Sequence, residues 1–309
     1  MKKLLLFLFL FLASCSIDNN TNYIHVEKET LTGEMDYLLI SEFTMDINGI
    51  EILIQDYSII NPSSNARLDM TIYRPNDEAK HSAVILVPGG LGTKKDFLKK
   101  PFSSENEYYT PEIFASKGFV TLIFSADGRG DSDGEEDYNG YIHQDGLYQL
   151  YRFLENDDKI NSIGIVSYSY GIAMASGMIG RYQPELNYYI EWEGPVDRYF
   201  VTHDCENFGA VKESIDCDDN DYWNERETLR FVPYFSTKYF IIIQSENDHA
   251  QDTWLHSVII NNLAIQYLDW VRVNGPENQI NQKYNLNTFP TSNHNLKDQD
   301  ILSYMEELS

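Results

Sequence analysis

The sequence predicts an α/β fold built on a mostly parallel sheet, and two patterns in its 309 residues support this prediction. Short apolar runs alternate with segments that suit helices, which is the order of parallel βαβ units. Ahead of them, three segments alternate apolar and polar residues or are rich in β-branched residues, as antiparallel strands are. We therefore expect antiparallel N-terminal strands, then a parallel sheet with helices on both faces.

The expected elements follow one another regularly along the chain. The antiparallel strands are expected at Tyr37–Thr44, Ile50–Ile60 and Arg67–Tyr73. Buried strands are expected at 83–87, 119–124, 163–166, 188–190 and 239–243, and helices at 111–117, 144–154, 170–182 and 253–267. Ligands bind at the carboxyl ends of strands in such sheets, so polar residues at those ends are the candidates for chemistry.

The composition indicates a folded protein and argues against two classes of partner. Hydrophobic residues make up 42% of the chain, which is ordinary for a protein with a buried core. The formal net charge of −25 repels nucleic acid and anionic membrane surfaces, so we expect neither as a partner.

The N-terminus has the features of an export signal. Lys2 and Lys3 precede the apolar run Leu4–Leu12, which is too short to span a bilayer, so residues 1–14 are predicted to be a signal peptide. Leu12-Ala13-Ser14-Cys15 resembles the bacterial lipobox, whose cysteine carries acyl chains such as palmitate. The resemblance implies lipidation of Cys15, export, and a membrane anchor followed by a flexible tether over residues 15–36. The alternative is an ordinary cleaved signal with an incidental cysteine.

Residues 193–237 interrupt the alternation of strands and helices. This stretch is acidic and aromatic, and we expect a lid-like insertion with some helix of its own, inside a domain that spans residues 37–309. It contains Cys205 and Cys217, which an oxidising compartment would allow to form a disulfide; two unpaired thiols are the alternative. Its acidic residues 216–221 either bind calcium or face solvent.

The segment Gly164–Ala173 carries the strongest signal for chemistry. An apolar strand runs into a sharp turn and then a helix rich in small residues. This segment resembles the nucleophile elbow G-x-S-x-G of α/β hydrolases, with Ser167 in place of the first glycine. The resemblance implies that Ser169 is the nucleophile, while the rival Ser167 would place its side chain in the strand.

An oxyanion hole requires two backbone N–H groups, and two segments are candidates for them. One group would come from Tyr170, which follows the predicted nucleophile. The loop Val87–Gly92 is similar to the His-Gly-Gly loop of esterases, with proline at the histidine position, and implies Gly90 as the second donor, with Leu91 as the next choice. A phosphate-binding loop fits poorly, because no Gly-Lys-Ser/Thr follows the glycines.

Residues 125–134 follow the next strand and resemble the D-x-R-G-x-G-x-S-x-G turn of α/β hydrolases, with Asp131 at a glycine position. The resemblance implies a structural turn near the site. A calcium loop is the alternative, but Arg129 stands where the first acidic ligand would belong.

The predicted acid follows the strand at 239–243. The loop Gln244–His249 is similar to the G-x-x-D-x-x-V loop of the family, which implies Asp248 as the acid and His249 as its neighbour. Glu246 and Asp252 are rivals on composition alone. A buried carboxylate at this point would hold the catalytic base in one tautomer.

The predicted base lies beyond the acid, as the chain order Ser, Asp, His of this fold requires. His256 falls inside an expected helix, whereas His294 lies in a loop before the last helical stretch, which is the usual family position. The resemblance therefore implies His294 as the base of a triad with Ser169 and Asp248.

Over residues 50–309 the chain resembles α/β-hydrolase serine hydrolases of the dienelactone-hydrolase, cocaine-esterase and Xaa-Pro dipeptidyl peptidase kinds. Asp221–Arg226 and the lead-in Tyr73-Arg74-Pro75 carry the finer resemblance, although core packing is the favoured role of Trp223. The resemblance implies hydrolysis of a small-molecule carboxylic ester through an acyl-enzyme, with no metal or other cofactor. A serine peptidase for short peptides and a non-catalytic surface-binding lipoprotein that keeps the fold are the alternatives.

Overall fold

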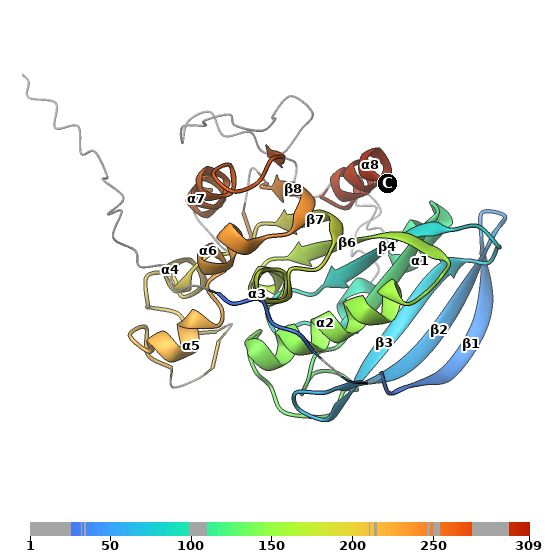
Figure 1. The fold of residues 1–309 in the computed structure, drawn as a ribbon, viewed down its shortest axis with the longest axis horizontal. Helices are drawn as coiled ribbons and strands as arrows, with labels where there is room; N and C mark the ends of the chain where they lie inside the picture. The colour runs from blue at the N-terminus through green and yellow to red at the C-terminus, as the bar shows by residue number, and fades with distance from the viewer. Residues whose placement is uncertain are drawn as a thin grey trace, which may run out of the picture.

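Nine strands form one mixed sheet in the computed structural model, in the order β1-β2-β3-β5-β4-β6-β7-β8-β9 (Figure 1). The structure describes residues 26–31, 33, 35–98, 110–209, 211, 212, 215–245, 248, 249, 254–273 and 297–309. The strands are β1 (Tyr37–Ile47), β2 (Ile50–Asn61), β3 (Ala66–Pro75), β4 (His81–Val87), β5 (Phe119–Phe124), β6 (Ile160–Tyr168), β7 (Leu186–Trp192), β8 (Thr237–Ile243) and β9 (Val271–Val273).

The first three strands form the antiparallel part of the sheet, as predicted. β1 pairs with β2 and β2 with β3, and β3 joins the rest of the sheet by antiparallel pairing with β5. Burial alternates at the start of β2, where Ile52 and Ile54 face the core and Glu51 is exposed. This pattern is the one that a strand with one buried face produces.

The remaining strands are parallel and largely buried, which agrees with the apolar runs of the sequence. β4 lies between β5 and β6, and β7, β8 and β9 follow in parallel register. Every residue of β5 is buried, as helices on both faces of a parallel sheet require. β9 was not among the expected strands, because three residues are too short a run to stand out in a sequence.

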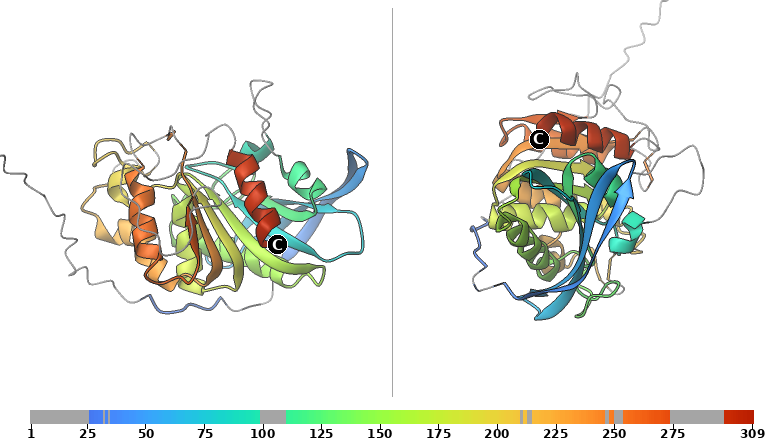
Figure 2. Two further views of the ribbon diagram at one scale, coloured as in Figure 1. Left: turned by 90° about the horizontal axis from the view of Figure 1, so that it is seen from above. Right: turned by 90° about the vertical axis from the view of Figure 1, so that its right-hand side faces the viewer.

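Helices cover both faces of the sheet (Figures 1 and 2). One face packs against α2 (Tyr141–Glu155), α3 (Gly171–Tyr182) and α7 (Leu255–Ala264), and the other against α1 (Pro111–Ser116) and α8 (Lys297–Leu308). Fully burying a Leu, Ile or Phe side chain contributes about 1.5–3 kcal/mol. The two apolar clusters therefore fix the sheet and, with it, the position of every loop at its carboxyl edge.

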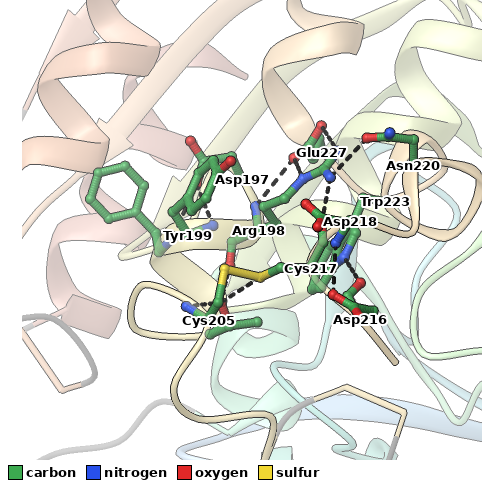
Figure 3. Close-up of a disulfide and its surroundings, with 12 residues drawn as sticks. Asp197, Arg198, Tyr199, Cys205, Asp216, Cys217, Asp218, Asn220, Trp223 and Glu227 are labelled. Atoms are coloured by element: carbon green, nitrogen blue, oxygen red, sulfur yellow. Dashed lines mark hydrogen bonds and ion pairs between the residues drawn. A yellow bond between two sulfur atoms is a disulfide. The ribbon is translucent and has the colours of Figure 1, made fainter. Parts of the chain in front are cut away.

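The insertion before β8 has helices of its own, as expected. They are α4 (Arg198–Val201), α5 (Asn220–Asn224), α6 (Thr228–Phe231) and the 3-10 helix η2 (Val232–Tyr234); a further 3-10 turn, η1 (Lys94–Leu98), follows β4. A disulfide joins Cys205 to Cys217 and closes the part between α4 and α5 (Figure 3).

Arg198 ties the disulfide-closed segment to the start of α6. Its guanidinium donates to Glu227 at 2.6 Å and to the Cys217 carbonyl oxygen at 2.6 Å (Figure 3). Two of the acidic residues that raised the possibility of calcium accept hydrogen bonds from backbone N–H groups: Asp216 from Asp218, and Asp219 from Tyr222. These two carboxylates therefore stabilise turns of the insertion.

The described part of the predicted tether lies against the domain. Glu29 forms an ion pair with Arg181 at 2.6 Å, and its N–H donates to the Arg181 carbonyl oxygen at 2.8 Å. Val26 and Leu31 pack on the apolar cluster under α2, α3 and α7. Residues 26–31 are therefore bound to the domain, whereas the sequence predicted a flexible tether here. Cys15 and the signal residues 1–14 lie outside the described residues. No helix in the described ranges is long and apolar enough to cross a membrane.

Candidate active site

The carboxyl ends of β6, β7 and β8 bring the candidate residues to one edge of the sheet. Tyr168 pairs with Trp192, and Trp192 pairs with Ile243. Beyond the strands, the Ser169 N–H donates to the Trp192 carbonyl oxygen at 2.8 Å and the Glu193 N–H to that of Ile243 at 3.0 Å. The residues that follow three neighbouring strands therefore lie side by side.

Ser169 occupies the tight turn between β6 and α3. Its φ of 50° is in the left-handed region, which costs energy for a residue with a Cβ and is typical of functional sites. A Cβ built on Gly171 would lie 2.5 Å from the Pro88 carbonyl oxygen, so only glycine fits there. The rival Ser167 is buried in the sheet and bonded to the Tyr189 hydroxyl at 3.0 Å, as expected of a strand residue.

The loop after β4 packs directly on this turn. A Cβ built on Gly89 would lie 2.7 Å from the Tyr168 carbonyl oxygen and 2.9 Å from Ser169 Cβ. Gly90, the predicted oxyanion donor, has a φ of 54°, and Leu91 is 47% exposed. The structure thus brings the glycine loop against the turn that holds Ser169.

His249 contacts the hydroxyl of Ser169. Its Nε2 lies 2.7 Å from Ser169 Oγ, and its side chain is 31% exposed. The sequence analysis took His249 for a neighbour of the acid, whereas the structure places its imidazole against Ser169. The loop after β8 crosses the carboxyl ends of β7 and β6, which carries its histidine to the nucleophile elbow.

Glu193 holds the other nitrogen of this imidazole. Its Oε2 lies 2.6 Å from His249 Nδ1, and its oxygens accept hydrogen bonds from the Ser245 N–H at 3.1 Å and the His249 N–H at 3.3 Å. The side chain is fully buried, and the φ of Glu193 is 48°. The two oxygens of a carboxylate can accept from all of these donors.

The sequence prediction missed Glu193, because the residue was taken as the first of the insertion. The signal was available: Glu193 directly follows an apolar strand, at the edge where ligands bind. The chain order Ser169, Glu193, His249 still follows the order serine, acid, histidine of the fold.

Asp248, the predicted acid, lies beside this pair and is bonded to another histidine. Its Oδ2 lies 2.9 Å from His256 Nε2 and accepts from Gln244 Nε2 at 3.0 Å. Its Oδ1 is 3.6 Å from His249 Nδ1, about 1 Å farther than the Glu193 oxygen.

The predicted base, His294, lies outside the described residues, as do the rival acids Glu246 and Asp252. The triad of Ser169, Asp248 and His294 therefore stays a prediction.

Two neighbours of the imidazole shape its electrostatic environment. The Trp192 ring stacks on His249 with centroids 4.8 Å apart and planes inclined by 14°, so it covers one face of the imidazole. Burial raises the pKa of Glu191 well above its usual value, and the charges of Glu193 and Asp248 add to the shift. Burial thus favours the neutral form of Glu191.

Glu193, Asp248 and His249 also offer metal-ligand atoms, which all lie within 4.8 Å of one another. A Zn²⁺ ion there would have to replace the proton that His249 Nδ1 donates to Glu193. In the described geometry Glu193 and His249 are hydrogen-bonded to each other, and Asp248 is bonded to His256.

The insertion packs on the residue that follows the nucleophile. Tyr170 is buried with Val201, Val211 and Trp223 in a small apolar cluster, so Trp223 has the packing role that we favoured. Arg226 donates to the Asp137 carbonyl oxygen at 2.7 Å and the Tyr138 carbonyl oxygen at 3.1 Å. These contacts connect the insertion to both sides of the nucleophile elbow.

The turn at 125–134 is structural, as its resemblance implied. Arg129 forms a bidentate pair with Glu136, both bonds at 2.7 Å. Asp127 is buried and accepts from Asn61 Nδ2 at 2.8 Å. The turn thereby anchors the loop between β5 and α2 behind the site.

Comparisons with known proteins bear on the fold. Residues 64–215 match the model of the X-Pro dipeptidyl-peptidase (S15 family). A search of curated proteins by sequence gives no match.

Solved structures of similar fold include acetyl xylan esterase 1 from Thermoanaerobacterium sp. (TM-score 0.56, 13% identity, 88% of each chain covered). An S-formylglutathione hydrolase from Agrobacterium tumefaciens is similar with TM-score 0.57 and 12% identity, over 88% of this chain and 99% of that one. A CocE/NonD family hydrolase from Staphylococcus aureus is similar with TM-score 0.56 and 15% identity; 90% of this chain aligns with 54% of that one. The sheet order and these likenesses show that the chain has the α/β-hydrolase fold.

Proposed function

We propose that the protein is a serine hydrolase that cleaves carboxylic esters, with Ser169 as nucleophile, His249 as base and Glu193 as acid. One observation carries the proposal: a single imidazole lies 2.7 Å from the Ser169 hydroxyl and 2.6 Å from a buried carboxylate. This is the spacing that general-base activation of a hydroxyl requires.

The acylation step follows from these contacts. His249 Nε2 takes the hydroxyl proton as Ser169 Oγ bonds to the ester carbonyl carbon, and the carbonyl oxygen becomes negative. The N–H groups of Tyr170 and Gly90, with Leu91 as second choice for the latter, stabilise this oxygen. His249 then gives the proton to the departing alkoxide as its C–O bond breaks.

Deacylation repeats these transfers with water. His249 takes a proton from water, whose oxygen attacks the acyl carbon, and returns the proton to Ser169 Oγ as the acid product leaves. In both steps the transient imidazolium is stabilised by the Glu193 carboxylate and by the face of Trp192, which stacks on it.

Substitution of the two serines tests the proposal. Ser169→Ala is expected to abolish hydrolysis of p-nitrophenyl acetate and labelling by a fluorophosphonate probe. Ser167→Ala is the matched control, two residues away in the same motif, and should still be labelled. Equal labelling of Ser169→Ala and wild type would contradict the assignment and leave the non-catalytic lipoprotein as the better interpretation.

Peptide hydrolysis is the second candidate, and the match of residues 64–215 to the X-Pro dipeptidyl-peptidase model favours it. The same triad chemistry serves esters and amides. Turnover of glycyl-prolyl p-nitroanilide and p-nitrophenyl acetate by one preparation separates the two: kcat/KM higher for the anilide would favour the peptidase.

We also propose that the protein is exported and held to a bacterial membrane by lipid on Cys15. The predicted signal and lipobox support this location, and a disulfide is at home in an oxidising compartment. Wild-type protein should incorporate radiolabelled palmitate in bacterial cells and Cys15→Ala should not; equal incorporation would contradict the anchor.

A further inference from the structure

A second histidine–carboxylate pair lies beside the proposed triad. Asp248 Oδ2 is 2.9 Å from His256 Nε2, and His256 Nδ1 is 2.9 Å from the Gly194 carbonyl oxygen. His256 is fully buried at the start of α7, and the Asp248 side chain is 3% exposed. The His256 ring also contacts Phe200 of the insertion, with centroids 5.6 Å apart.

The hydrogen-bond partners of His256 show which groups engage this pair. The Gly194 carbonyl oxygen can only accept, so Nδ1 of His256 carries a proton. At Nε2 the ring faces Asp248 Oδ2, which also accepts from the Gln244 amide at 3.0 Å. Asp248 Oδ2 is therefore engaged by His256 and Gln244, both outside the Glu193–His249 pair.

Two carboxylates therefore flank one N–H group of His249. Glu193 Oε2 is 2.6 Å from His249 Nδ1, and Asp248 Oδ1 is 3.6 Å from the same nitrogen. A single N–H makes one strong hydrogen bond, so the carboxylate that reaches it decides the orientation of the base. Hydrogen bonds with His256 and Gln244 hold Asp248 at this longer distance from His249 Nδ1.

We propose that His256 is a positioning residue that withholds Asp248 from His249, so that Glu193 alone acts as the acid and Asp248 is a reserve. The inference rests on the proposed serine-hydrolase function. It predicts that weakening the hold of His256 on Asp248 lets Asp248 replace Glu193.

Two substitutions at position 256 separate the two contacts of its ring. His256→Asn places an amide near the position of Nδ1 and keeps a donor for the Gly194 carbonyl, but it is too short to reach Asp248. His256→Gln places its amide near the position of Nε2 and keeps the hydrogen bond to Asp248. The pair differs in the one contact on which the inference depends.

Steady-state kinetics on p-nitrophenyl acetate then test the inference. Glu193→Gln is expected to lower kcat by about 10⁴-fold, the loss typical of a triad acid made neutral. Adding His256→Asn to Glu193→Gln should recover at least about tenfold of that loss through coupling between neighbouring sites, whereas adding His256→Gln should recover none. A further Asp248→Asn change should abolish the recovery. Equal activity of the Asn and Gln double variants, both folded by circular dichroism, would overturn the inference.

A second comparison does not depend on the folding of any position-256 variant. If Asp248 is withheld, adding Asp248→Asn to Glu193→Gln leaves the residual kcat unchanged; a further loss would mean that Asp248 already serves His249 and would overturn the inference. A proton resonance of the His249 Nδ1–H far downfield should disappear in Glu193→Gln and return with His256→Asn; its failure to return would also overturn it. Failure of the proposed function looks different, because Ser169→Ala would then keep wild-type activity.

Discussion

Ser169 and Glu193 end two neighbouring parallel strands in the same left-handed backbone conformation, with φ values of 50° and 48°. Each such residue costs about 1–3 kcal/mol and persists where the surroundings impose it. Here the Ser169 N–H is held by the carbonyl oxygen of Trp192, the residue before Glu193. The two strained turns present a hydroxyl and a carboxylate to opposite nitrogens of one imidazole.

Glu193→Gln should lower kcat by about 10⁴-fold with little change in KM, because a neutral amide no longer stabilises the imidazolium. Glu191→Gln is the matched control: this buried glutamate lies two residues away and touches neither Ser169 nor His249 in the described structure, so kcat should stay near the wild-type value. Ester kinetics measure both, and a Glu193→Gln enzyme within tenfold of wild type would contradict the assigned role.

Glu191→Gln should raise stability at neutral pH. The folded-state pKa of Glu191 is raised by burial, so the folded protein keeps a proton that the unfolded chain loses above a pKa of about 4.3. The free energy of unfolding then falls by about 1.4 kcal/mol per pH unit above that value until the folded carboxyl ionises. Gln has no such proton to lose. Urea unfolding at pH 4.5 and pH 7.5 should show a gain for the variant only at the higher pH; an equal difference at both would contradict this account.

Gly89→Ala should lower kcat without unfolding the protein. Its new Cβ would meet the Tyr168 carbonyl oxygen at 2.7 Å and Ser169 Cβ at 2.9 Å, so the nucleophile elbow or the oxyanion loop must move. Displacing a positioned group by about 1 Å costs about 10²-fold in rate. Stopped-flow acylation by p-nitrophenyl acetate measures the effect, and an unchanged acylation rate would show that the loop does not contact the reacting groups.

Replacing both cysteines of the insertion by serine should destabilise it. The bridge closes a loop with a sequence separation of 12, and the chain-entropy model assigns about 3 kcal/mol to a loop of that size. Limited proteolysis should cut the Cys205→Ser/Cys217→Ser variant within residues 199–223 sooner than wild type. Equal cleavage rates would mean that packing of Trp223 and the Arg198 contacts hold the segment without the bridge.

The elements that appear as a continuous pattern of neighbouring residues could be predicted from the sequence. Buried strands such as β5 appear as apolar runs, because both faces of a parallel sheet exclude water. Ser169 was found in the same way, since strand, tight turn and small-residue helix are contiguous in the chain. β9, with three residues, left too short a trace.

The partners of Ser169 depend on sheet register, which a single sequence does not reveal. Glu193 is 24 positions and His249 80 positions from Ser169, and they meet because β7 lies between β6 and β8. Asp248 and His249 are adjacent in sequence, yet they belong to different histidine–carboxylate pairs: His249 pairs with Glu193, and Asp248 pairs with His256. Local motif matching therefore pointed to the segment that holds Asp248 and His249 and could not decide which of these side chains contacts Ser169.

The rate of fluorophosphonate labelling in histidine variants tests the central claim most directly. Ser169→Ala serves as the variant that takes no label. His249→Ala should be labelled at least about 10³-fold more slowly than wild type, because no base then activates the Ser169 hydroxyl. His294→Ala, which removes the base that the sequence predicted, should be labelled at the wild-type rate. Wild-type labelling of His249→Ala together with loss of labelling in His294→Ala would contradict the account.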